Sequence, residues 1–121
     1  MNEVQQSLRI LVVEDEYLLA EDLRMGLTEQ NMVVVGPAGS VKDALALIAA
    51  ETIDAAVLDI SLNGENVIPV VEALSARSVL FVFATGYDAF DLPLAWRDVP
   101  RFEKPVDATV LAKALRGALV P

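Results

Sequence analysis

Five side chains that could do chemistry together are spread along this chain, each at or just beyond the end of a predicted strand. The carboxylates belong to Glu14, Asp15 and Asp59, and a hydroxyl and an ammonium follow at Thr85 and Lys104. Carboxylates that lie close together repel one another unless they are protonated or hold a cation. Oxygen ligands without histidine or cysteine suit a hard ion, so we expect Mg²⁺ first, with Mn²⁺ or Ca²⁺ as substitutes. A hydroxyl and an ammonium beside a metal-bound carboxylate form a site for a phosphoryl group.

Asp59 is the most informative of these residues because of the stretch that precedes it. The apolar run 55–58 and the turn pair Asn63-Gly64 predict a short strand buried on both faces. An unpaired carboxylate inside such a strand would be very costly, so Asp59 is expected at its carboxyl end. In an open parallel sheet, ligands bind at that edge.

The composition excludes several classes of function. The 121 residues, 55% of them hydrophobic, predict one folded domain over 1–121, with 1–7 as a frayed N-terminus. Cysteine and histidine are absent, which excludes disulfides, thiolate metal sites and imidazole catalysis. A formal charge of −9 without a basic cluster argues against direct nucleic-acid binding. With neither a signal peptide nor a long apolar run, we expect a cytoplasmic protein without membrane insertion.

The elements that must position these residues follow from an alternation of strands and helices. Strands are predicted over 8–13, 32–35, 54–59, 79–84 and 100–103. Helices are predicted after the acids 14–16 to about Gln30, from 40, from 65 and from 107. The alternation predicts an α/β fold, a flavodoxin-like (βα)5 doubly wound parallel sheet with strand order 2-1-3-4-5. In that order the first and third strands are neighbours, so Glu14, Asp15 and Asp59 converge on one edge. The segment 87–99, which Pro93 interrupts, is expected to be a short or unstable helix.

Local signals set several boundaries. Asn31 is expected to end the first helix, and Gly36-Pro37 to end the second strand. Ser40 and Asp107 are expected to cap the helices that they precede. The buried side of the last helix is predicted to consist of Val110, Leu111, Ala114, Leu115 and Ala118.

Each candidate residue has an ordinary explanation when it is taken alone. The acids at Glu14 and Asp15 favour a helix N-terminus, Asp59 could cap a loop, Thr85 could satisfy a turn and Lys104 could be a surface lysine. Their shared position at the carboxyl ends of strands in one predicted sheet is what makes the set specific.

Four motifs together resemble the receiver domain of two-component response regulators across nearly the full chain. They are Leu11-Val12-Val13-Glu14-Asp15-Glu16, Leu58-Asp59-Ile60 with Leu62 and Gly64, Ala84-Thr85-Gly86, and Glu103-Lys104-Pro105. The resemblance implies that Asp59 accepts a phosphoryl group from a sensor histidine kinase or a histidine phosphotransfer protein. It also implies that the chain catalyses this transfer and the later loss of its phosphate, and that it relays the signal to a downstream protein.

The resemblance assigns a role to each matching residue. Asp15 and Asp59 would hold Mg²⁺ directly, Glu14 through water, and the Ser61 carbonyl would complete the protein ligands. Thr85 and Lys104 would bind the phosphoryl oxygens.

The stretch Phe83-Ala84-Thr85-Gly86-Tyr87 resembles the "FAT GUY" receivers, which are often stand-alone and associated with HWE-type histidine kinases. Three residues before Lys104, receivers usually carry an aromatic switch residue, but this chain has Arg101. Phe102 should point to the opposite face of its strand. We therefore expect signalling to order the segment 87–99 when Thr85 engages the phosphoryl group.

Two further positions bear on the lifetime of the phosphate. Ser61 and Tyr87, two residues beyond Asp59 and Thr85, occupy positions that tune water access in receivers. Neither is an acid or an amide and Tyr87 is bulky, so slow to moderate self-dephosphorylation is expected.

Three other readings remain open at this stage. A pseudo-receiver that binds partners without phosphorylation would have no need of the acidic cluster. A small metal-dependent phosphatase would carry a second acid where Ser61 stands. A flavodoxin-type cofactor protein would show a phosphate-binding loop after the first strand, and none is present.

Overall fold

The fold is built on a single parallel sheet. The computed structural model describes residues 7–86 and 94–119. Its strands are β1 (Arg9–Val13), β2 (Val33–Ala38), β3 (Ala55–Asp59), β4 (Leu80–Thr85) and β5 (Arg101–Glu103). The strand order is β2-β1-β3-β4-β5 and every pairing is parallel, which confirms the predicted topology.

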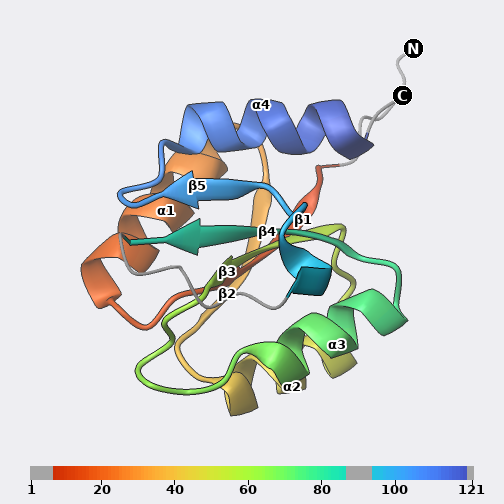
Figure 1. The fold of residues 1–121 in the computed structure, drawn as a ribbon. Helices are drawn as coiled ribbons and strands as arrows, with labels where there is room; N and C mark the ends of the chain where they lie inside the picture. The colour runs from red at the N-terminus through yellow and green to blue at the C-terminus, as the bar shows by residue number, and fades with distance from the viewer. Residues whose placement is uncertain (1–6, 87–93, 120–121) are drawn as a thin grey trace.

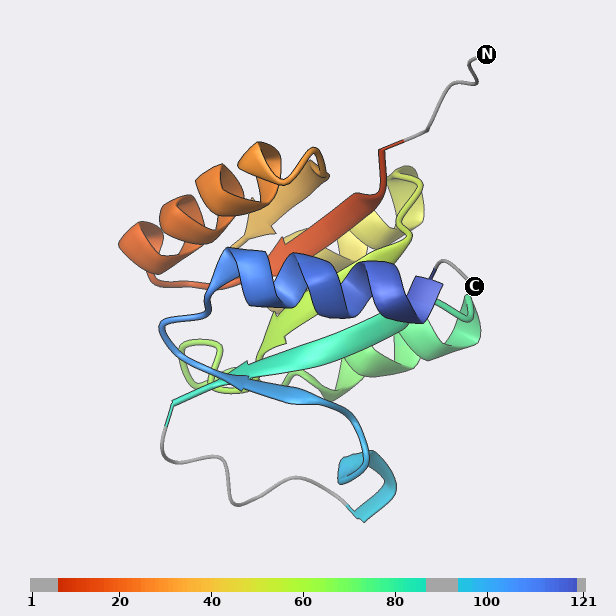
Figure 2. The same cartoon turned by 90° about the horizontal axis from the view of Figure 1, so that it is seen from above.

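Helices cover both faces of this sheet (Figures 1 and 2). Their bounds are α1 (Tyr17–Glu29), α2 (Val41–Ala50), α3 (Ile68–Ala76) and α4 (Ala108–Leu119). One buried cluster joins the sheet to α1 and α4, and a second joins it to α2 and α3. All residues of β3 are buried, as expected of a central strand that is covered on both sides.

The predicted caps are present. Ser40 Oγ accepts the Asp43 N–H at 3.1 Å, and Asp107 Oδ1 accepts the Thr109 N–H at 2.9 Å. After α1, Asn31 has a φ of 64°, and its N–H donates to the Thr28 carbonyl. The Met32 N–H donates to the Leu27 carbonyl, which completes a Schellman motif.

The prediction that Gly36-Pro37 ends the second strand is wrong, because β2 continues through this pair to Ala38. Gly36 has a φ of +93°, and an added Cβ would lie 2.8 Å from the Ala38 nitrogen. The pairing register shifts here, between Leu11 and Val13 of β1. Because β2 lies at the edge of the sheet, it has only one neighbouring strand. The missing N–H of Pro37 therefore costs no bond to a second neighbour.

The predicted buried side of the last helix is also partly wrong. Leu111 and Leu115 are buried, but Val110 is 54% exposed and Ala112 is buried in its place. Ala114 and Ala118 are exposed. Apolar residues occupy most positions of α4, so periodicity could not fix which side faces the sheet, and packing against α1 decides it.

Two boundaries differ modestly from the predictions. α3 begins at Ile68 rather than near residue 65, and Pro69 lies in its first turn, where a missing N–H costs nothing. Between β4 and β5 the structure describes a short 3-10 helix, η1 (Leu94–Trp96), and the predicted behaviour of residues 87–93 lies outside the described part of the chain.

Within residues 7–86 and 94–119, no helix is both long and apolar enough to cross a membrane.

Close contact between α1 and α4 gives a test of this packing. An added Cβ at Gly26 would lie 2.4 Å from Ala108 Cβ, so the helices must separate to admit it. We expect Gly26→Ala to lower the free energy of unfolding by about 1–3 kcal/mol, the usual cost of overpacking. The measurement is urea unfolding followed by circular dichroism.

Gly117→Ala is the matched control, because no atom lies within 4 Å of an added Cβ there. This change should stabilise the protein by up to about 1 kcal/mol through helix propensity. If both variants gained stability, the close approach of α1 and α4 would be wrong.

Candidate functional site

The site lies where the strands end, and backbone bonds tie each strand end to its neighbour. The register pairs Val13 with Leu58, which places Glu14 beside Asp59 at the end of the sheet. The Glu14 N–H donates to the Ala38 carbonyl at 2.9 Å, and the Lys104 N–H donates to the Thr85 carbonyl at 2.8 Å. These bonds hold the ends of β1 and β5 at fixed positions.

The sheet brings the three predicted carboxylates together. Glu14, Asp15 and Asp59 each offer an oxygen atom within 4.8 Å of the others. Glu14 is 7% exposed and Asp59 is 2% exposed, whereas Asp15 is half-buried. Charges that are buried to this extent must be paired or hydrogen-bonded.

Lys104 supplies that pairing from the end of β5. Its Nζ lies 2.8 Å from Asp59 Oδ2 and 2.9 Å from Glu14 Oε1. The remaining oxygens accept backbone bonds, since Asp59 Oδ1 accepts the Ser61 N–H at 2.9 Å and Glu14 Oε2 accepts the Glu16 N–H at 3.0 Å. In the described part of the chain, no buried side-chain polar atom lacks a partner.

The electrostatics of the cluster favour a bound cation. Burial alone would lower the pKa of Lys104, but its hydrogen bonds and charge interactions with Asp59 and Glu14 raise that pKa above the usual 10.5. Lys104 therefore stays charged and offsets one of the three carboxylates, which leaves two negative charges. A divalent ion would balance them.

The donor set also fits Mg²⁺ chemically. The three carboxylate oxygens lie within 4.8 Å of one another, so one Mg²⁺ ion could be held among them, directly or through water. All the available ligands are oxygens, as this hard ion prefers.

Thr85 and Ser61 lie at the same edge and are engaged with the backbone. Thr85 is 7% exposed, and its hydroxyl donates to the Gly86 carbonyl at 2.9 Å. The Ser61 carbonyl accepts the Asn63 N–H at 2.9 Å and keeps a second lone pair for another partner. Both residues line an open hollow that also contains Asp15, Asp59 and Lys104.

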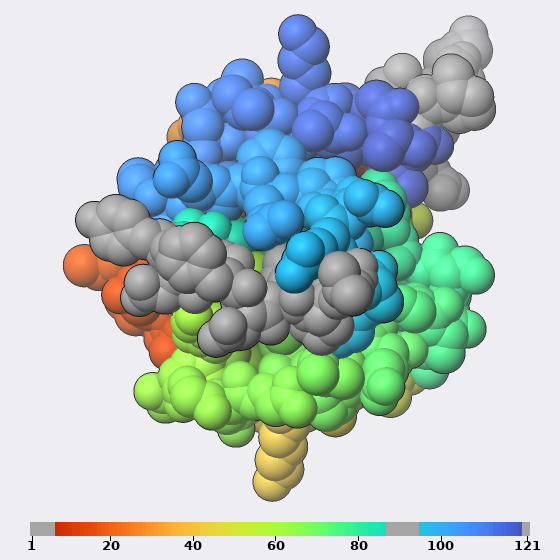
Figure 3. Space-filling model, in the orientation of Figure 1, coloured from red at the N-terminus to blue at the C-terminus, as the bar shows by residue number. Residues whose placement is uncertain are grey.

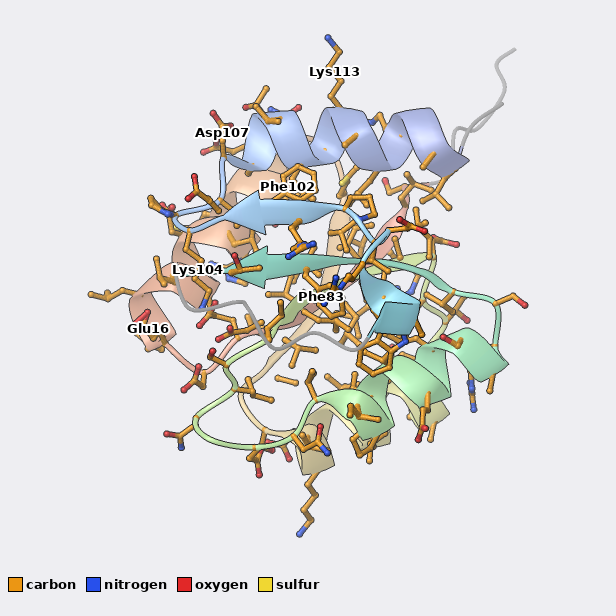
Figure 4. All side chains as sticks on the ribbon, in the orientation of Figure 1. Glu16, Phe83, Phe102, Lys104, Asp107 and Lys113 are labelled. Atoms are coloured by element: carbon orange, nitrogen blue, oxygen red, sulfur yellow. The ribbon has the colours of Figure 1, made fainter. Side chains whose placement is uncertain are left out.

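Glu16 also belongs to the site, although it was not among the predicted site residues. Its backbone N–H fixes the Glu14 carboxylate, and the residue lines the same hollow as Lys104 (Figure 4). Only the Glu14-Asp15-Glu16 run hinted at this, because a residue at a helix N-terminus has an unpaired N–H to offer.

The residues named as switch positions are not all at the site. Arg101 is exposed and pairs in register with Phe83, while Phe102 packs into the cluster beneath α1 and α4 (Figure 4). Phe102 therefore faces away from Phe83, as strand alternation predicts. Trp96 packs on Phe83 instead, with ring centroids 6.3 Å apart. Tyr87 lies outside the described residues.

Comparison with known proteins now defines the class. Residues 10–116 match the family described as "Response regulator receiver domain", so the chain belongs to the receiver domains of response regulators. It is 42% identical to SdrG from Sphingomonas melonis Fr1, with a TM-score of 0.82 over 97% of this chain and all of that one. A second structure, the BeF3-activated conformation of SdrG from Pseudomonas melonis Fr1, is also 42% identical, with a TM-score of 0.77 over 96% of this chain and 100% of that one.

A curated relative is the sensory transduction protein LytT of Bacillus cereus, 34% identical over 88 residues. The match takes in 70% of this chain but only 36% of LytT. The chain thus spans about a third of that relative's length.

The raised pKa of Lys104 predicts a pH dependence of stability. Because the pKa is higher in the folded protein, the ion pairs contribute fully below pH 10.5, the usual value, and are lost as the pH rises through the folded-state pKa. Lys104→Met should therefore cost stability at pH 8, by about 3 kcal/mol, the lower end of the cost of breaking a buried pair. Above pH 10.5 the wild type loses the charge on Lys104, so the difference in unfolding free energy between the wild type and Lys104→Met should shrink.

Urea unfolding of both proteins from pH 7 to 11.5 measures this difference. Lys113→Met, on the exposed side of α4, removes the same charge far from the cluster (Figure 4) and serves as the control. A pH-independent difference for Lys104→Met would contradict the assignment of the stabilisation to the ammonium.

Proposed function

We propose that this receiver domain is a Mg²⁺-dependent phosphoacceptor that is phosphorylated on Asp59 and passes the signal on through protein–protein contacts. The observation that carries the proposal is the acidic cluster around Asp59 with the Lys104 ammonium bonded to it. A surface used only for docking would gain nothing from burying these charges, which argues against the phosphorylation-independent pseudo-receiver.

In the proposed reaction, an Asp59 carboxylate oxygen attacks the phosphorus atom and the bond to the donor nitrogen breaks. Asp15 and Asp59, with Glu14 through water and the Ser61 carbonyl, would hold Mg²⁺, which neutralises charge on the transferring oxygens. Lys104 would neutralise a further oxygen. Thr85 would exchange its bond to the Gly86 carbonyl for one to the phosphoryl group.

The donor histidine must lie outside these 121 residues, because they contain no histidine. A phosphohistidine of a sensor histidine kinase or a histidine phosphotransfer protein is the proposed source. The Phe83–Tyr87 motif supports a kinase of the HWE type. The BeF3-activated conformation of the 42% identical SdrG supports the view that this site responds to a phosphoryl group.

Phosphorylation can be tested directly on the purified protein. Incubation with a small phosphodonor and Mg²⁺ should give one hydroxylamine-labile adduct in the intact mass spectrum, and EDTA should prevent it. Asp59→Asn should abolish the adduct, whereas Asp43→Asn, on the exposed side of α2, should not. Persistence of the adduct in Asp59→Asn would refute the assignment.

The role of Thr85 can be tested through Trp96, the single tryptophan of the chain. Trp96 packs on Phe83, two residues before Thr85 on β4, so movement at this strand end should change its fluorescence. We expect a fluorescence change on phosphorylation of the wild type that is largely lost in Thr85→Ala. Thr85→Ser, which keeps the hydroxyl, should retain it.

The mass spectrum supplies the control, because Thr85→Ala should still form the adduct. An undiminished fluorescence change in that variant would show that Thr85 does not couple the phosphoryl group to this region.

A further inference from the structure

The loop between β3 and α3, residues 60–67, carries the proposed Ser61 ligand and is anchored in an unusual way. Leu62 is fully buried in the cluster beneath α2 and α3. Asn63 and Gly64 then turn the chain, with φ values of 51° and 78°, and the Glu65 N–H donates to the Leu62 carbonyl at 2.8 Å. Positive φ at both central residues is what a tight type I′ turn requires. Glu65 is exposed, and the loop that carries it, light green in Figure 3, forms part of the molecular surface.

Glu65 makes a contact with a different element. Its Oε1 accepts the Val41 N–H at 2.8 Å, at the first residue of α2. That N–H has no partner inside the helix, and a carboxylate at a helix N-terminus is favoured by the helix dipole. Ser40 caps the Asp43 N–H of the same turn, so the Glu65 bond adds a second, long-range cap.

The backbone that leads into α2 contacts Glu14 and Asp15, the side of the acidic cluster that lies opposite Asp59 and Ser61. The Ala38 carbonyl, at the end of β2, accepts the Glu14 N–H. An added Cβ at Gly39 would lie 3.9 Å from both the Asp15 Cα and the Glu14 carbonyl oxygen, so the backbone leading into α2 passes beside these residues. The bond from Glu65 to Val41 therefore links the Asp59–Ser61 side of the cluster to the Glu14–Asp15 side.

We infer that Glu65 is a positioning residue for ion binding: by accepting the Val41 N–H, it holds the loop and its Ser61 carbonyl at the distance from Glu14 and Asp15 that one Mg²⁺ ion requires. Lys104 holds the same cluster from the β5 side, and Glu65 holds it from the β2 side. The inference rests on the proposed Mg²⁺-dependent function but concerns a residue that does not touch the ion.

The test measures Mg²⁺ affinity without any phosphodonor. Titration followed by Trp96 fluorescence or amide chemical shifts should show that Glu65→Ala weakens Mg²⁺ binding by about tenfold, as removing a hydrogen bond behind a metal ligand does elsewhere. Glu65→Gln keeps an oxygen acceptor and should restore most of the affinity. Glu72→Ala removes the same charge from the exposed side of α3 and should leave the affinity unchanged.

Val41→Pro removes the donor instead of the acceptor. Proline is well tolerated at the first position of a helix, and Ser40, with a φ of −147° and a ψ of 160°, already has the extended backbone that precedes proline. Val41→Pro should weaken Mg²⁺ binding as Glu65→Ala does, while Val41→Ala should not. The double variant Glu65→Ala with Val41→Pro should bind no more weakly than either single variant. Melting curves show whether each variant is folded.

The outcomes separate this inference from the proposed function. Equal weakening in Glu65→Gln and Glu65→Ala would show that Glu65 acts by its charge alone and would overturn the positioning role. Unchanged affinity in Glu65→Ala and Val41→Pro would overturn it as well, while the wild type still bound Mg²⁺ and formed its adduct. A wild type that binds no Mg²⁺ would instead refute the proposed function itself.

Discussion

The ammonium of Lys104 between Asp59 and Glu14 is the interaction on which the rest of the site depends. Two carboxylates that are almost fully buried would repel each other and cost several kcal/mol if they were left unpaired. Lys104 can reach both because its backbone is bonded to the end of β4 while the acids end β1 and β3. A shift of any of these strands by one residue would turn a side chain away and break the arrangement.

The fold could be predicted well where the sequence carries a strong local signal. Apolar runs that end in acids or turn residues gave the strands, and Ser40, Asp107 and Asn31 marked helix ends that the structure confirms. The strand order followed from the alternation of elements and the handedness of the connections. Once that order was assumed, the convergence of Glu14, Asp15 and Asp59 was a consequence of topology rather than of any one motif.

The remaining features could not be predicted because they depend on contacts between distant segments. Gly36-Pro37 carries a turn signal, yet strand pairing with β1 overrides it and β2 continues. Ala112 is buried in place of Val110 because α1 lies against that side of α4, and the helix sequence alone contains no record of this neighbour. The link from Glu65 to Val41 joins residues that are 24 positions apart, without any local pattern that would connect them.

The irregular pairing of β2 at Gly36-Pro37 has a consequence for how this molecule behaves at high concentration. An open sheet offers its outermost strands as templates for other chains, and long, regular edges promote intermolecular pairing and fibril formation. Here one edge strand, β2, contains Pro37, which has no N–H, and its pairing with β1 shifts register. The other edge strand, β5, spans only three residues. The sheet thus gives a second chain little to pair with, which disfavours assembly of two copies edge to edge.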